Sequence, residues 1–213
     1  MVIDLLKKLE NKTITKENLV EKVKQDFKIL PEIIEAMNSN KATIRYGCGK
    51  ILMNLSETNP DKLYPYMDKF TTFLDSKYRI ITWQAMAIIA NLTKVDTKKK
   101  FDSIFDKYYS LLNDEYMVTV ANIVGRSGKI ALAKPYLIPK ITDRLLSVEN
   151  IKITPHLTKE CKLVIAQNAI ESFDMFFDKV KEKEKVISFV KKFNNSTRKS
   201  LKVLAQEFLK KWI

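Results

Sequence analysis

The chain carries a repeated pattern of apolar residues that has the spacing of one helix face. In the first clear copy, apolar residues follow one another at steps of four, three, one and three positions: Ile44, Cys48, Ile51, Leu52 and Leu55. Side chains three and four positions apart lie on the same side of an α-helix. Because the neighbouring residues are mostly polar, this segment predicts a helix with one buried face.

The same pattern returns at four later places in the sequence. From Cys48 to Ala85 the shift is 37 residues, and the next shifts are 36, 45 and 35 residues. Self-similarity at such a period is typical of helical-repeat proteins. The later copies are Ile81, Ala85, Ile88, Ile89 and Leu92; Met117, Ala121, Val124, Gly125 and Gly128; Ala166, Ala169, Ile170 and Phe173; and Leu201, Leu204, Ala205 and Phe208.

Each copy follows a second amphipathic segment, so the repeat unit is a pair of helices. We name the first helix of each pair helix A and the second helix B. Asn, Asp and Ser lie between them, as is common where one helix ends and the next is capped. Pro65 and Pro139 are expected to kink their A helices. Helices A are predicted at 30–37, 63–74, 101–112, 137–146 and 186–193, and helices B near 41–57, 78–93, 114–130, 158–177 and 196–212.

A single helix pair cannot bury its apolar face, so neighbouring pairs must stack. We therefore predict an all-α fold, a right-handed α-solenoid of about five helical hairpins with a curved surface. Amphipathic segments near the start predict N-terminal capping helices at 1–26, followed by the repeat domain at 27–213. The whole chain is expected to form a single structural domain.

The first repeat also resembles a known family. The stretch from Leu30 to Met37 has a proline at its second position and is followed by Asn38, then by Ile44 and Arg45 before a helix of small residues. This arrangement resembles a HEAT repeat, and residues 48–92 are similar to the amino-terminal HEAT regions of adaptins. The resemblance implies a HEAT-like scaffold over residues 27–213, with armadillo-like units as the alternative subclass.

Composition supports a helical protein of a reducing compartment. Only four glycines and six prolines occur in 213 residues, which disfavours turn-rich β folds. Cys48 and Cys161 lie far apart, without the spacing of a disulfide framework or a zinc site. The first residues do not resemble a signal peptide, and no apolar run is long enough to span a bilayer. We expect a cytoplasmic protein without a transmembrane segment.

Charge indicates anionic partners. With 38 basic and 25 acidic residues the net charge is +13, which attracts nucleic acid, acidic proteins or acidic membrane surfaces. The lysines are spread widely along the chain, so simple solubility is the alternative explanation.

The residues that usually carry catalysis are scarce. His156 is the only histidine, and it lies beside Pro155 in a polar segment where a solvated side chain is expected. The glycines of Gly47-Cys48-Gly49 and of residues 125–128 fall inside predicted helices, which indicates close packing and not a phosphate-binding loop. We expect no catalytic, metal-binding or cofactor-binding residue, and no cofactor.

The candidate partner-binding surface gathers cations at the starts of the B helices, with Tyr46 and Trp83 at equivalent repeat positions. Equivalent positions of a solenoid align, so these cations are expected to form a stripe. For Arg45 an ion pair between repeats, with Asp75 or Asp114 as acceptor, is the preferred alternative. The residues of this surface are Lys41, Arg45, Tyr46, Arg79, Trp83, Lys159, Lys162, Arg198, Lys199 and Lys202.

One segment breaks the period. Residues 147–158 lengthen the fourth repeat by about eight residues, and such insertions become surface loops that often mark a binding face.

The function predicted from these features is a non-enzymatic scaffold for protein–protein interaction. The alternative is nucleic-acid binding, including a DNA alkylation repair glycosylase, which the chain resembles in size, basicity and repeat architecture. In that case Trp83 with Asp75 or Asp114 would be the candidate site. A third possibility is binding to an anionic membrane surface through the Lys-rich carboxyl terminus.

Overall fold

The protein is built from α-helices and short 3-10 turns, as the repeat pattern predicts. A computed structural model describes the backbone of residues 2–213 and the side chains of residues 3–213. No β-strand occurs in this part of the chain, where a single isolated bridge joins Thr154 and Leu157. The all-α prediction is therefore confirmed.

The contacts between residues gather into two compact units, Met1–Ile104 and Phe105–Ile213. Helix α8, Lys100–Ser110, contains the boundary between them. The predicted boundary near residue 26, and the prediction of a single domain, stay predictions. We describe each unit by itself.

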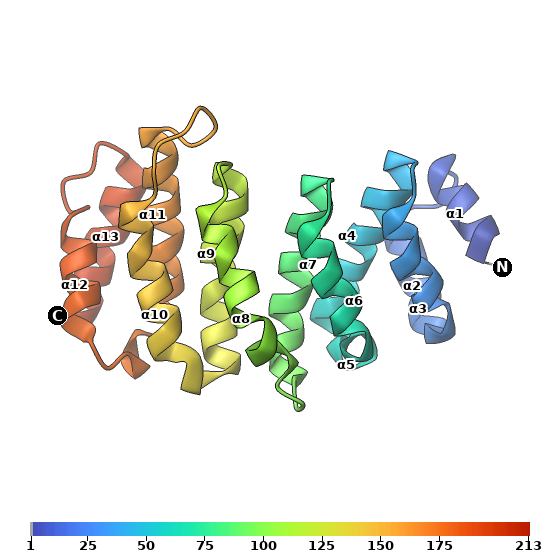
Figure 1. Ribbon diagram of the computed structural model, residues 1–213, viewed down its shortest axis with the longest axis horizontal. Coiled ribbons are helices and arrows are strands. Elements are labelled where there is room, and N and C mark those ends of the chain that lie inside the picture. The colour runs from blue at the N-terminus through green and yellow to red at the C-terminus, as the bar shows by residue number, and fades with distance from the viewer. Residues whose placement is uncertain (1) are drawn as a thin grey trace. The chain divides into compact units, whose positions relative to one another are not determined.

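In unit 1, two helices at the amino-terminal end pack against the first B helix. Both α1 and α2 contact α4, and α4 contacts α7 (Figure 1). Because α4 and α7 correspond to the B helices predicted at 41–57 and 78–93, consecutive repeats stack through their B helices. The helices are α1 (Val2–Glu10), α2 (Lys16–Gln25), α3 (Leu30–Glu35), α4 (Ala42–Thr58), α5 (Pro60–Leu63), α6 (Met67–Thr72) and α7 (Arg79–Leu92).

Unit 2 follows the same plan. Helix α11 lies between α9 and α13 and contacts both (Figure 1). These three correspond to the B helices predicted at 114–130, 158–177 and 196–212, and α9 begins three residues later than predicted. The helices that follow α8 are α9 (Met117–Ala133), α10 (Ile138–Leu146), α11 (Lys159–Asp174), α12 (Lys183–Lys191) and α13 (Lys199–Trp212).

The two prolines expected to kink A helices behave differently. Pro65 lies in a 3-10 turn, Tyr64–Tyr66, that separates α5 from α6, so the predicted helix 63–74 is broken there. Pro139 lies in the first turn of α10. A first-turn residue needs no intrahelical N–H bond, so proline is tolerated without distortion. The expected kink at Pro139 is therefore wrong.

The repeated apolar positions form the core of each unit. Cys48 and Ala85 are fully buried, and so are Val124, Ala169 and Ala205. A Cβ atom on Gly49 would lie 1.8 Å from Gln84 Oε1, and one on Gly128 would lie 3.2 Å from the Ser172 carbonyl oxygen. These two glycines allow the close helix approach that the sequence predicts. Gly125 does not, because it is exposed and an added Cβ atom would meet only Asn168, at 3.9 Å.

The turn before α8 is organised by a buried carboxylate. Asp96 accepts hydrogen bonds from the Tyr64 hydroxyl at 2.6 Å and from the backbone N–H groups of Lys100 and Phe101 at 2.8 and 2.9 Å. Lys99 has φ of 53°, the left-handed conformation, which tightens the turn. Asp96 therefore caps α8 and fastens it to the preceding repeat.

Exposed ion pairs link consecutive repeats inside each unit, and in all those described here the acid belongs to the earlier repeat. Each such pair contributes at most about 1 kcal/mol, because both groups remain hydrated. In these pairs the order of acid and base along the chain is therefore always the same. On the side of the A helices the pairs are Glu35–Lys69, Asp68–Lys100, Asp106–Arg144 and Glu149–Lys192, and on the side of the B helices they are Glu10–Lys41, Glu160–Arg198 and Asp174–Lys211.

Candidate partner-binding site

A short side-chain hydrogen bond sets the start of most B helices. In the turn before each of these helices, a Ser or Asp oxygen accepts from the backbone N–H two residues later. This fixes the first residue of the helix and with it the cations that follow. The bonds are Ser39 to Lys41, Ser76 to Tyr78, Asp114 to Tyr116 and Ser196 to Arg198, at 2.8–3.2 Å. Before α11 the cap is Thr158, which accepts from the Cys161 N–H.

Arg45 does not belong to a binding surface, because its side chain is enclosed. The residue is 5% exposed. Its guanidinium donates to the carbonyl oxygens of Ser39 and Asn40 at 2.6 and 3.2 Å and lies 3.5 Å from the centre of the Tyr78 ring. The expected carboxylate partner is thus replaced by backbone oxygens of its own turn. Arg45 joins two repeats and is not available to a partner.

Tyr46 and Trp83 occupy equivalent, half-buried positions of consecutive B helices. The Tyr46 hydroxyl accepts from Arg45, and its backbone oxygen accepts from Gln84 Nε2 at 3.0 Å. Tyr46 therefore takes part in packing between α4 and α7 and shows only one side to solvent.

Two of the other predicted cations, Lys41 and Arg198, have carboxylate partners inside the protein. Lys41 pairs with Glu10 at 2.8 Å. Arg198 pairs with Glu160 at 2.8 Å and contacts Gln167. Arg79 is half-buried. The cations that remain exposed and outside the described ion pairs all belong to unit 2: Lys159, Lys199 and Lys202.

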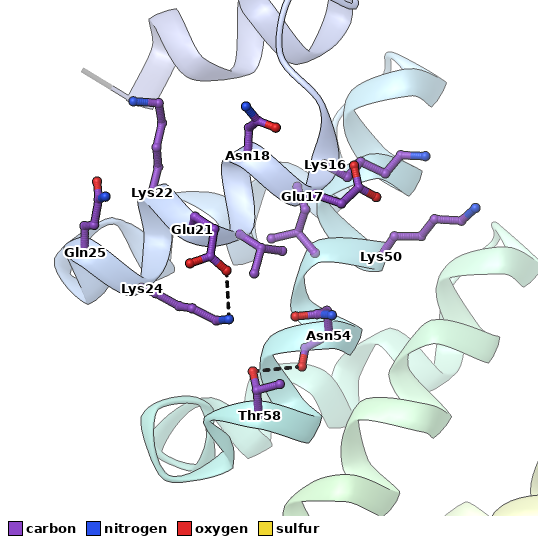
Figure 2. A pocket seen from close by; sticks show the side chains of 12 residues that line it. Lys16, Glu17, Asn18, Glu21, Lys22, Lys24, Gln25, Lys50, Asn54 and Thr58 are labelled. Atoms are coloured by element: carbon purple, nitrogen blue, oxygen red, sulfur yellow. Dashed lines mark hydrogen bonds and ion pairs between the residues drawn. The ribbon is translucent and has the colours of Figure 1, made fainter.

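A polar groove in unit 1 was not foreseen from the sequence. It lies between α2 and α4 and has a volume of about 760 Å³. Figure 2 shows Glu21 and Lys24 of α2 turned toward Asn54 and Thr58 of α4, whereas Asn18 and Lys22 point away from them. From the sequence, α2 was expected only to cap the repeats, although its mixture of amide and charged residues could have indicated a polar groove. The lining of the groove includes Asn18, Lys22 and Gln25 of α2 and Lys50, Asn54 and Thr58 of α4.

Charge in this groove is partly balanced. Lys24 pairs with Glu21 at 2.9 Å, and the Thr58 hydroxyl donates to the Asn54 carbonyl oxygen at 3.2 Å (Figure 2). Lys50 is exposed and points away from both. Four lysines, Lys16, Lys22, Lys24 and Lys50, stand against Glu17 and Glu21, so the groove has a net positive charge and also offers amide groups.

The insertion at 147–158 forms a loop that docks on the preceding repeat. Thr154 Oγ1 donates to the Glu115 carbonyl oxygen at 2.7 Å, and the Met117 N–H donates to the His156 carbonyl oxygen at 3.3 Å. The His156 ring stacks on Tyr116 with centroids 4.2 Å apart and an interplanar angle of 9°. His156 is exposed, yet it is a stacking residue and not only a solvated one.

Beneath this loop lies an apolar pocket of about 450 Å³, bounded by α11 and α12. It brings together Lys159 and Lys162, two of the predicted surface residues, with Lys192. The Lys162 ammonium donates to the Glu149 carbonyl oxygen at 3.0 Å, and Lys192 pairs with the Glu149 carboxylate at 2.7 Å. The apolar walls are Val148, Ile153, Leu163, Ala166, Phe189 and Phe193.

Within the residues whose side chains are described, no group of three or more His, Cys, Asp or Glu side chains could hold a metal ion. Burial raises the pKa of the Cys48 thiol to about 12, so this thiol stays protonated and unreactive at neutral pH. None of the described helices is long and apolar enough to cross a membrane.

Comparison with known proteins shows a likeness of fold. Neither a scan against protein-family models nor a search of curated protein sequences found a match. Among solved structures, the designed armadillo repeat protein YIII(Dq)4CqI is similar, with a TM-score of 0.65 and 16% identity over 96% of this chain and 90% of that chain. A second designed armadillo repeat protein, YIII(Dq.V1)4CPAF in complex with the peptide (KR)4, has the same TM-score and coverage at 15% identity. An engineered protein matches with a TM-score of 0.51 and 14% identity over 84% of this chain and 76% of that chain.

These likenesses show an armadillo-like helical-repeat fold. The HEAT subclass and the adaptin-like character of residues 48–92 stay predictions.

Proposed function

We propose that this armadillo-like chain is a non-enzymatic scaffold that binds a segment of another protein in the groove between α2 and α4. The observation that carries the proposal is the row of amide and lysine side chains along the groove (Figure 2). Its volume of about 760 Å³ suits several residues of an extended peptide.

The chemistry of the groove fits a peptide main chain. Each amide side chain carries both a donor and an acceptor, which is what the N–H and C=O groups of an extended strand require. Asn54 and Gln25 supply such groups from opposite sides. Lys22 and Lys50 add positive charge, which favours a peptide with carboxylates.

The peptide-bound designed armadillo protein supports the proposal through its fold, but its ligand has the opposite charge. The peptide (KR)4 is basic. This chain carries +13, so a basic peptide would be repelled at long range and an acidic one attracted. We therefore propose an acidic segment as the partner.

The test is selection from a displayed library of random peptides with the full chain as bait. Enriched peptides should be acidic, and Asn54→Ala combined with Lys50→Glu should weaken their binding by roughly tenfold or more. Lys28→Glu is the matched control, because Lys28 is exposed on unit 1 and does not line the groove. Absence of enriched peptides, or equal loss in the control, would overturn the proposal.

Nucleic-acid binding is the second candidate, and the net charge of +13 favours it. The residues expected for a DNA glycosylase give it little support, since Asp114 accepts a hydrogen bond in a helix-capping turn and Asp75 is exposed at the end of a helix A. A titration of duplex DNA against salt decides between the two. Tight binding that falls steeply with salt would favour nucleic acid.

A further inference from the structure

We infer that the pocket beneath the 147–158 loop is a second peptide site, which takes a large apolar side chain of a partner segment that also carries a carboxylate next to it. This inference rests on the proposed function, because it assumes that partners are proteins. It adds a separate binding site in unit 2 and states which peptide residues that site would recognise.

The first observation is the contrast between walls and rim. The walls are aliphatic and aromatic side chains from the loop, α11 and α12, whereas the rim carries Lys159, Lys162 and Lys192. Burying one large apolar side chain stabilises a complex by roughly 1.5–3 kcal/mol. A pocket of about 450 Å³ has room for a Leu, Met or Phe side chain together with adjoining main chain.

The second observation is the charge left over at the rim. Glu149 engages both Lys162, through its carbonyl oxygen, and Lys192, through its carboxylate. Lys159 is exposed and takes part in none of the described ion pairs. One acid against three lysines leaves the rim positive, so a carboxylate beside the anchoring side chain would meet Lys159.

The third observation is that the loop is held in place before any partner binds. Its contacts with Glu115, Tyr116 and Met117 fix the segment that carries Ile153. Ile153 is 54% exposed and forms one edge of the pocket. A preformed edge reduces the ordering entropy that binding costs.

A polyanion without an apolar anchor fits this pocket poorly. Nucleic-acid phosphates would meet the three lysines but would leave the apolar walls uncovered. An acidic membrane could supply both a headgroup and an acyl chain, so vesicles are included in the test. The observations favour a peptide, because the pocket is small and its polar groups lie at one rim.

The experiment measures the affinity of peptides selected against the full chain, by fluorescence anisotropy. Ile153→Ser and Lys159→Glu should each weaken the peptides that use this pocket by roughly tenfold, since one removes apolar contact and the other reverses the rim charge. Both side chains are exposed, so the fold should persist, which circular dichroism checks. Lys181→Glu is the matched control, with the same change of charge at an exposed site of unit 2 outside the pocket and outside the candidate surface.

The outcomes separate this inference from the proposed function. Weakening by Ile153→Ser and Lys159→Glu, but not by Lys50→Glu, supports the inference. Peptides that respond only to Lys50→Glu and Asn54→Ala would leave the proposed function standing and overturn the inference. A failure to select any peptide would overturn both. The chain is also tested on phosphatidylserine vesicles. If it bound them more tightly than any selected peptide, and if Ile153→Ser abolished that binding, the ligand of the pocket would be a membrane and the inference of a peptide would be overturned.

Discussion

Gly49 offers a direct test of the way the first two B helices approach each other. Gly49 lies on α4, and a Cβ atom added there would lie 1.8 Å from Gln84 Oε1 and 2.9 Å from Gln84 Nε2. Gln84 is 4% exposed, and its Nε2 donates to the Tyr46 carbonyl oxygen at 3.0 Å. In Gly49→Ala the Gln84 amide must therefore move and give up this hydrogen bond.

Two effects of opposite sign decide the size of the change. Replacing a helical glycine by alanine raises stability by about 1 kcal/mol through helix propensity. Overpacking costs roughly 1–3 kcal/mol, and a buried amide donor without a partner costs roughly 1–3 kcal/mol more. We expect a net loss of about 1–5 kcal/mol in the free energy of unfolding.

Gly125 provides the matched control. It lies in α9, is exposed, and an added Cβ atom would meet nothing closer than 3.9 Å. Gly125→Ala should therefore stabilise unit 2 by about 0.5–1 kcal/mol. The double variant Gly49→Ala with Gln84→Ala removes the clash, so its loss should be smaller than the sum of the two single losses.

The assay is urea unfolding followed by tryptophan fluorescence. The chain has two tryptophans, Trp83 in unit 1 and Trp212 in unit 2, so a Trp212→Phe background reports on unit 1 and a Trp83→Phe background on unit 2. If Gly49→Ala stabilised unit 1 as much as Gly125→Ala stabilises unit 2, the close approach of α4 and α7 at Gly49 would be refuted.

Three further predictions concern single side chains. Asp96→Ala removes the cap of α8 and the hydrogen bond from Tyr64, so it should destabilise unit 1 by roughly 2–4 kcal/mol in the same urea assay. Asp96→Asn should cause a smaller loss, and equal losses in the two variants would argue against a role for the negative charge. Arg45→Lys should cost about 1–2 kcal/mol of stability, because the planar guanidinium stacks on Tyr78 and binds two carbonyl oxygens. Peptide affinity should stay unchanged, and a change in affinity without a loss of stability would show that Arg45 contacts the peptide. At mildly alkaline pH a thiol reagent should label Cys161 and spare Cys48, whose pKa of about 12 keeps it protonated, so Cys161→Ser should abolish labelling of the folded chain.

The helix pairs could be predicted because their signal is local and repeated. Apolar spacing located α4, α7 and α11 closely, since burial of one face requires that spacing wherever the repeat occurs. The starts of α9 and α13 were each placed three residues too early, because Asp114 and Ser196 cap the turns and do not begin the helices. The spacing of apolar residues shows which face of a helix is buried, but it does not show at which residue of the turn the helix begins.

The candidate sites depend on contacts between distant residues, which periodicity does not encode. For Arg45 the sequence favoured an ion pair between repeats over a place on the binding surface, because nothing in the sequence shows that the side chain turns back to the carbonyl oxygens of Ser39 and Asn40. The loop at 147–158 was recognised as an insertion, but its docking on Glu115 and Tyr116 joins residues about forty positions apart. The pocket beneath it follows from that docking and could not be derived from either segment alone.

The direction of the ion pairs between repeats bears on how such a chain changes its length. Each repeat offers a carboxylate to the repeat that follows and a cation to the one before, as Asp68 and Lys69 do side by side on α6. Loss of one whole repeat by a genetic deletion would therefore leave a repeat that carries a spare acid next to one that carries a spare base, and duplication would do the same. The charges at the new junction would be of opposite sign, but their side chains would start from different positions within the repeat.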